Sequence, residues 1–155
     1  MTRTLCRLLT ASGGRMTFEQ FMAAALYHPD FGYYARNIRT VGRTGDFSTS
    51  GMLHPLLARA VARWVAEYGR KTGVWRVIEI GPGSGQMAVW VRRALPLTAR
   101  WRVKFHLVET STVLRERQRE LLGGGARWHD SVRDALRECG GRALIYSNEL
   151  VDAFP

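Results

Sequence analysis

Hydrophobic residues recur at helical spacing in the first half of the chain and in short, nearly unbroken runs in the second half. Within residues 53–70 the apolar positions follow an i, i+3, i+4, i+7 pattern, with charged residues between them. They are Leu53, Leu56, Leu57, Ala60, Val61, Trp64, Val65 and Tyr68. This spacing predicts a long amphipathic helix whose apolar stripe packs on a sheet. A shorter helix is predicted over residues 18–27, because Thr17 and Gln20 match a capping box and Pro29 ends the pattern.

Four apolar runs in the second half of the chain alternate with amphipathic segments. The runs are residues 75–80, 102–108, 126–128 and 142–147, and the segments between them are residues 86–95, 111–122 and 131–138. Strands and helices that alternate at this spacing imply right-handed crossovers between parallel strands. The pattern therefore predicts an α/β fold with a doubly wound parallel sheet.

The chain divides into three predicted parts. Residues 1–15 contain three arginines and no acid, and we expect a flexible extension there. Residues 16–73 hold the two predicted helices and, over residues 30–50, a loop rich in glycine and polar residues with four aromatics. Loops of this length are often functional, so a lid over a ligand is predicted, although Phe47 can equally be buried in a packing turn. Residues 74–155 form the α/β part.

A glycine-rich turn follows the first predicted strand, in the sequence Glu-Ile-Gly-Pro-Gly-Ser-Gly of residues 79–85. Glycines between a strand and a helix let the backbone N–H groups approach a ligand closely. The dinucleotide fingerprint G-x-G-x-x-G would require a third glycine where Gln86 stands. This spacing argues against a nicotinamide oxidoreductase. The turn residues expected to line a cofactor are Gly81, Pro82, Gly83 and Gly85.

Carboxylates at the ends of the predicted strands indicate which cofactor the turn would hold. Glu79 precedes the first glycine by two residues, where it would repel a diphosphate and attract the cationic groups of S-adenosylmethionine (SAM). Glu109 ends the second strand and can accept both ribose hydroxyls. Asp130 follows the third strand and can bind the adenine amino group, with Trp128 or His129 lining the pocket. Asp130 can alternatively cap the next helix.

Motifs on both sides of this turn resemble one methyltransferase family. They are FMAAALYHPDFGYY (residues 21–34), GDFSTS (45–50), VIEIGPGSG (77–85) and SNELVDAFP (147–155), with a weaker match at 107–111, Leu114 and Gln118. Together they are similar to the MidA type, whose members assist assembly of mitochondrial complex I and methylate arginine in one of its subunits. The resemblance implies a class I SAM-dependent methyltransferase with a Rossmann-like sheet, an N-terminal helical segment and a protein substrate.

The chain departs from the family in two places. Gly51 and Met52 stand where family members usually have Pro-Glu, and the family's fold continues past the motif that contains Pro155. We therefore expect an incomplete sheet and, as a partner, the remainder of the domain encoded downstream. A binding or assembly module without catalysis is an alternative hypothesis.

The resemblance places the methyl acceptor after the fourth predicted strand. Asn148 is expected to position the acceptor or the amino-acid part of SAM, and Glu149 and Asp152 to clamp a guanidinium, since carboxylates pair well with its planar fork of donors. Asp46 is expected to lie in the lid over SAM. The structural alternatives are that Asp152 caps a following helix and that Glu149 forms a salt bridge.

Composition limits the remaining classes. The net charge is +10, but the basic residues are almost all arginines spread along the whole chain, so nucleic-acid binding is not predicted. Cys6 and Cys139 lie far apart, and the four histidines (His28, His54, His106 and His129) are scattered singly, so no metal centre is predicted. The chain has no secretory segment and no apolar run long enough to span a membrane. We expect a cytoplasmic protein, or a mitochondrial one in a eukaryotic source.

Overall fold

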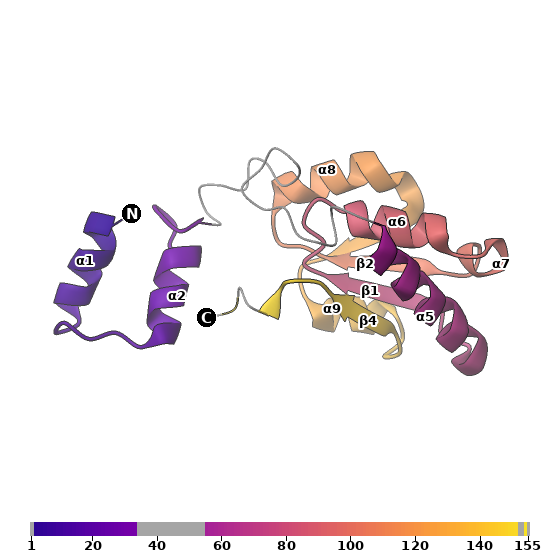
Figure 1. Cartoon of the computed structure of the whole chain (residues 1–155), viewed down its shortest axis with the longest axis horizontal. Coiled ribbons are helices and arrows are strands. Elements are labelled where there is room, and N and C mark those ends of the chain that lie inside the picture. The colour runs from indigo at the N-terminus through magenta and orange to yellow at the C-terminus, as the bar shows by residue number, and fades with distance from the viewer. Residues whose placement is uncertain (1, 34–54, 152–153, 155) are drawn as a thin grey trace. The chain divides into compact units, whose positions relative to one another are not determined.

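The computed structural model describes residues 2–33, 55–151 and 154 (Figure 1). The chain forms two compact units, one of Met1–Thr40 with Glu149–Pro155 and one of Val41–Asn148. Within the described residues, the longest helices are too short or too polar to cross a lipid bilayer.

Among its described residues, the first unit contains the helices α1 (Thr2–Ala11) and α2 (Phe18–Tyr27). The predicted capping box of α2 is present, since the backbone N–H of Gln20 donates to Thr17 Oγ1 at 3.1 Å and that of Thr17 to Gln20 Oε1 at 3.0 Å. Helix α1 occupies residues for which we expected a flexible extension. Its leucines, arginines and alanine favour a helix, and Gly13, with φ of 72°, lies just beyond its end.

The second unit contains the predicted parallel sheet. Its strands are β1 (Arg76–Ile80), β2 (Lys104–Val108), β3 (Ala126–His129) and β4 (Leu144–Ser147), in the order β3-β2-β1-β4. All three pairings are parallel. Because Ile80 pairs with both Val108 and Ser147, the carboxyl ends of the strands lie at one edge. The chain builds outward from β1 to β3 and then returns to the other side of β1, and ligands of such sheets bind where the order reverses.

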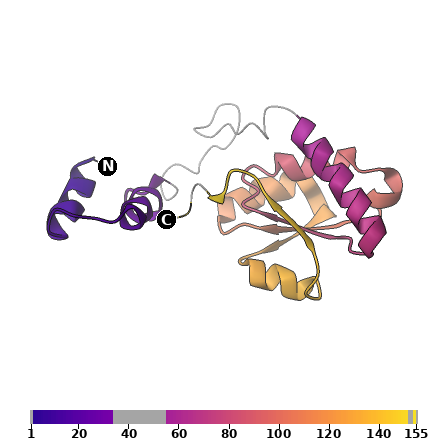
Figure 2. The same cartoon turned by 60° about the horizontal axis from the view of Figure 1, so that its bottom comes forward.

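Helices cover both faces of the sheet, as Figure 2 shows. One face packs against α5 (Leu56–Thr72), α6 (Gln86–Ala94) and α8 (Thr112–Leu122), through a core that includes Val65, Val77, Val91, Phe105 and Leu107. The other face packs against α9 (Val132–Glu138), through Ile78, Val108, Ala135 and Cys139. The predicted strands and helices are confirmed with small shifts at their ends. A short helix after Pro96, α7 (Leu97–Arg100), and a 3₁₀ turn, η1 (Gly123–Gly125), were not predicted.

Helix α5 packs through a stripe that only partly overlaps the predicted one, because Val61, Trp64 and Val65 contact the core as predicted. Its buried residues are Ala58, Ala62, Val65, Ala66 and Gly69, whereas Leu56 is 66% exposed and Tyr68 is 45% exposed. Small side chains let the helix approach its neighbours closely, and a Cβ on Gly69 would lie 2.5 Å from the ring of Trp75. Because of this packing α5 belongs to the α/β unit and not, as predicted, with the N-terminal helices.

Candidate cofactor site

The glycine turn links β1 to α6 at the carboxyl edge of the sheet. Gly81, Gly83 and Gly85 have φ angles of 65°, 55° and 80°, which lie in the left-handed region that favours glycine. The N–H of Gly81 donates to the carbonyl of Val108 at 3.1 Å, and that of Gly85 donates to the carbonyl of Pro82 at 2.9 Å. The predicted turn residues therefore form one compact loop that is fixed to the end of β2.

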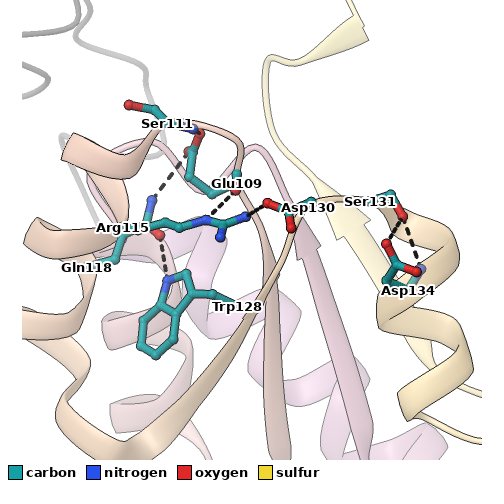
Figure 3. Close-up of polar contacts among 8 residues, drawn as sticks. All are labelled: Glu109, Ser111, Arg115, Gln118, Trp128, Asp130, Ser131 and Asp134. Atoms are coloured by element: carbon teal, nitrogen blue, oxygen red, sulfur yellow. Dashed lines mark hydrogen bonds and ion pairs between the residues drawn. The ribbon is translucent and has the colours of Figure 1, made fainter.

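The side chain of Gln118, in α8, binds the backbone of this turn. It is fully buried, and its Nε2 donates to the carbonyl of Gly83 at 2.8 Å. A Cβ on Gly85 would lie 3.0 Å from Gln118 Cγ, so the turn and α8 are in close contact. The amide also connects two strand ends, because Nε2 lies 3.4 Å from Glu109 Oε2 and Oε1 accepts from the indole N–H of Trp128 at 2.8 Å (Figure 3). Gln118 belongs to one of the sequence motifs, but no role was predicted for it.

Glu109, which follows β2 directly, keeps part of its hydrogen-bonding capacity. Its Oε1 accepts from the backbone N–H of Ser111 at 2.9 Å, and its Oε2 faces the amide of Gln118. Burial raises the pKa of this carboxyl, and the hydrogen bonds from Ser111 and Gln118 oppose the rise. An ionised carboxylate has about four acceptor positions, so the donors from Ser111, Gln118 and Thr110 leave capacity for a hydroxyl donor. This geometry suits the predicted contact with a diol.

Arg115 ties Asp130 to the same edge. Its Nε donates to the backbone carbonyl of Glu109 and its Nη2 to Asp130 Oδ1, each at 2.5 Å, so the guanidinium lies between the ends of β2 and β3 (Figure 3). The Asp130 side chain is 82% exposed and remains accessible to a ligand. The alternative that Asp130 caps α9 is wrong, because Ser131 is the N-cap and its Oγ accepts from the N–H of Asp134. Arg115 was not predicted as a site residue.

Trp128 and His129, one of which was expected to line the adenine pocket, form hydrogen bonds with other side chains. The indole N–H of Trp128 is bound to Gln118 on the α8 side of the sheet. The His129 ring is buried, and its Nε2 lies 2.9 Å from Nδ1 of His106. The expectation that all four histidines lie singly is therefore wrong for this pair.

Glu79 is buried near the end of β1, on the face covered by α5 and α6. Its Oε2 accepts from the hydroxyl of Tyr146, its neighbour on β4, at 2.8 Å. Burial raises the pKa of Glu79 to about 8, and the bond from Tyr146 only partly opposes this. A cation that approached this carboxyl would lower its pKa again. Tyr146 was not predicted as a site residue, since its pairing with Glu79 appears only once β1 and β4 are aligned.

The predicted acceptor residues are only partly described. Asn148 follows β4 directly and is half-buried at the same edge. Glu149 has a φ of 49°, a left-handed conformation that costs roughly 1–2 kcal/mol for residues other than glycine. Strained backbone of this kind often occurs at functional sites. Asp152, and Asp46, which we expected to lie in a lid, are outside the described residues.

Comparisons with known proteins show which family the chain is similar to. Residues 56–155 match the model of the family "Putative S-adenosyl-L-methionine-dependent methyltransferase". The chain is 29% identical to the mitochondrial protein arginine methyltransferase NDUFAF7 homolog of Caenorhabditis elegans and 25% identical to NDUFAF7 of Danio rerio, covering 92% of this chain in each case. It spans about two fifths of their lengths, 39% and 40% respectively.

A solved structure extends the likeness to the fold. A Burkholderia thailandensis protein bound to S-adenosylhomocysteine matches 99% of this chain with a TM-score of 0.75 and 32% sequence identity, and this chain covers 41% of that protein. The native crystal structure of a Burkholderia thailandensis protein matches with a TM-score of 0.71 at the same identity. The predicted α/β fold with a parallel sheet and the resemblance to the MidA type are thereby confirmed. The chain belongs to this family of S-adenosylmethionine-dependent methyltransferases.

Proposed function

We propose that this chain binds SAM at the carboxyl edge of β1, β2 and β3, and that it supplies the cofactor-binding part of an enzyme that methylates a protein side chain. The observation that carries the proposal is the Gln118 network, which fixes the glycine turn and Glu109 relative to each other. SAM is a nucleoside with an amino-acid tail. Gln118 thus holds the turn proposed for the tail and the carboxylate proposed for the ribose in one arrangement.

The groups at this edge suit the chemical parts of SAM. The glycine turn presents backbone next to α6, where the amino-acid tail can approach closely. The buried Glu79 carboxyl favours a positively charged group, since an ammonium or sulfonium stabilises its ionised form. Glu109 has acceptor positions left for the ribose hydroxyls, and Asp130 for the adenine amino group.

Methyl transfer from SAM does not require a covalent intermediate with the protein. Bound SAM supplies an activated methyl group, which an acceptor nucleophile takes by in-line displacement. The protein has to align the acceptor and help to remove its proton. For this role the sequence offers Asn148, which follows β4 directly, and Glu149, the next residue along the chain.

We infer arginine as the acceptor. Both curated relatives are named as protein arginine methyltransferases. A guanidinium pairs well with carboxylates, which is the role proposed for Glu149 and Asp152. Those relatives are also named as mitochondrial, so the cytoplasm is the proposed location only for a source without mitochondria.

A titration separates this function from the alternatives. Isothermal calorimetry of the chain with SAM, S-adenosylhomocysteine and NADH should show binding of the first two and not of NADH. Glu109→Gln should weaken SAM binding, and Glu116→Gln, at an exposed position of the following helix α8, should leave it unchanged. Binding of NADH without SAM would instead support an oxidoreductase.

Activity needs a second assay, because the chain spans only two fifths of its relatives. Tritiated SAM in a cell extract should label a protein band when the chain is supplied together with the sequence encoded downstream. SAM binding without label under these conditions would favour the alternative of a binding or assembly module.

A further inference from the structure

The face of the sheet covered by α9 holds a second group of polar side chains, separate from the cofactor edge. His106 of β2 is 0% exposed and His129 of β3 is 7% exposed. Glu138 is the last residue of α9. The chain separates them widely, but parallel pairing of β2 with β3 brings the two rings together under the helix. Charged and polar groups are seldom buried in this way without a partner that satisfies them.

The spacing of these three side chains fits a metal ion. His106 Nδ1 lies 2.9 Å from His129 Nε2, and one ligand atom from each of the three residues lies within 4.8 Å of the others. Two nitrogens bound to one tetrahedral Zn²⁺ lie about 3.3 Å apart, as follows from Zn–N distances of about 2.0–2.1 Å. The nitrogens therefore need to separate by a few tenths of an ångström, and the nearly coplanar rings need to tilt so that both lone pairs point at the ion. Glu138 can supply its oxygen by a change of rotamer, since its side chain is 36% exposed.

Both rings are in the protonation state that binds metals. Burial lowers the pKa of His106 to about 4 and lowers that of His129, so both imidazoles are neutral near pH 7. Neutral imidazole is the form that donates a lone pair to a metal. For His106 Nδ1 to bind a cation, the proton that it shares with His129 Nε2 would move to His106 Nε2, so that both rings stay neutral.

Hydrogen bonding leaves the histidine pair incompletely satisfied. If His106 Nδ1 donates to His129, then His129 Nδ1 carries a proton that faces Glu138 Oε2 at 3.8 Å, a favourable arrangement. In that tautomer His106 Nε2 is an acceptor, and among the described residues no donor contacts this buried atom. A buried polar atom without a partner is costly, which marks this histidine pair as an unusual feature of the sheet face.

Arg127 is the group that competes with a cation here. Its guanidinium pairs with Glu138, and it also lowers the pKa of both histidines. The Arg127 side chain is 69% exposed, so it can turn into solvent and release the carboxylate. A divalent ion bound by one carboxylate and two neutral imidazoles would form a complex with a net charge of +1.

We propose that His106, His129 and Glu138 form a Zn²⁺ site that joins β2, β3 and α9, with a fourth position open to water. Two imidazoles and one carboxylate are a ligand set that Zn²⁺ uses in proteins. The site would fix α9 to the β3 edge of the sheet, next to the strand end that carries Asp130.

Competition with a chromophoric chelator tests the site. The full chain, stripped with EDTA and titrated with Zn²⁺ at pH 7.5, should bind about one equivalent. Co²⁺ in place of Zn²⁺ should give the visible absorption of a tetrahedral site, and metal should raise the melting temperature. His129→Gln should abolish all three signals, and His28→Gln, a histidine of the other unit, should leave them unchanged.

A second variant keeps the test decisive if His129→Gln fails to fold. Glu138→Gln removes the ligand at the partly exposed end of α9 and should weaken Zn²⁺ binding at least about tenfold, with the far-ultraviolet circular dichroism unchanged. No binding by the wild-type chain would overturn the proposal. Binding that survives both Glu138→Gln and His129→Gln would also overturn it.

Discussion

Two carboxylates at neighbouring strand ends, Glu79 and Glu109, are stabilised in different ways. Glu109 has donors from the Ser111 backbone and the Gln118 amide, and the Arg115 guanidinium is nearby. Glu79 is deeper in the core and accepts from the Tyr146 hydroxyl. The Glu109 region is therefore organised by the protein itself, whereas ionisation of Glu79 depends on a cation brought by a ligand. This difference supports the proposal that Glu109 accepts from neutral hydroxyls and that Glu79 faces a positive charge.

The largest expected effect comes from Glu79→Gln. Because the folded-state pKa of about 8 lies above the unfolded value of 4.5, the native chain holds a proton that the unfolded chain releases. Wild-type stability should therefore fall as pH rises from 4.5 to 8, by at most about 5 kcal/mol. Urea unfolding at pH 5 and pH 9 measures this, and the variant should lose much less stability over that interval.

The same variant separates stability from binding. Glutamine keeps an acceptor for Tyr146 but cannot carry the negative charge, so SAM affinity should fall even though the folded chain is more stable at pH 9. Equal pH dependence in the variant and the wild type would show that Glu79 is not buried as a neutral acid.

Gln118→Leu tests the organised region next. It leaves the indole N–H of Trp128 without its acceptor and removes the donors to Gly83 and Glu109. We expect a loss of about 2–4 kcal/mol in the free energy of unfolding, because buried groups left unsatisfied cost about 1–3 kcal/mol each. Chemical denaturation measures this, and SAM affinity should fall with it. The control is Gln86→Ala in α6, which should change stability by less than about 1 kcal/mol.

Gly85→Ala isolates the contact between the turn and α8. Alanine at a φ of 80° is strained, and its Cβ would also meet Gln118 Cγ at 3.0 Å. Gly73→Ala is the matched control, because Gly73 has a φ of 72° and no described atom lies within 4 Å of the position that a Cβ would take. Both variants should lose about 1–2 kcal/mol from backbone strain, with a further loss only at Gly85. Equal melting temperatures of the two would show that the contact adds nothing.

The smallest effect is expected for Asp130→Asn. Its ion pair with Arg115 involves an aspartate that is 82% exposed, and such pairs contribute at most about 1 kcal/mol. Stability should therefore hardly change, while SAM affinity drops if this side chain accepts from the adenine amino group. Calorimetric titration at two salt concentrations distinguishes a lost hydrogen bond from a general charge effect.

The sequence predicted features that depend on local pattern. Apolar runs marked the strands, because parallel strands are covered on both faces, and the glycine turn could be located because left-handed φ angles favour glycine. The face of α5 was predicted only in part, since the pattern weights large apolar residues and the packing also uses Ala58, Ala62 and Gly69. Tertiary packing determines which face of α5 is buried, and helical periodicity alone does not show it.

The partners of the site residues could not be predicted. Tyr146 meets Glu79 only through the β1–β4 register, and Gln118 meets Gly83 across 35 positions of the chain. The histidine pair arises in the same way, from residues 23 positions apart on adjacent strands. The sequence identifies which acids stand at strand ends, but the hydrogen bonds that set their ionisation follow from strand order.

Calorimetric titration with SAM at pH 7, repeated in two buffers of different ionisation enthalpy, tests the central claim most directly. If the cationic groups of SAM ionise Glu79, binding should release about one proton per ligand, because a group with a pKa near 8 is mostly protonated at this pH. Glu109→Gln should bind more weakly with the same proton release. Failure of the wild-type chain to bind SAM, or binding without any release of protons, would contradict the account.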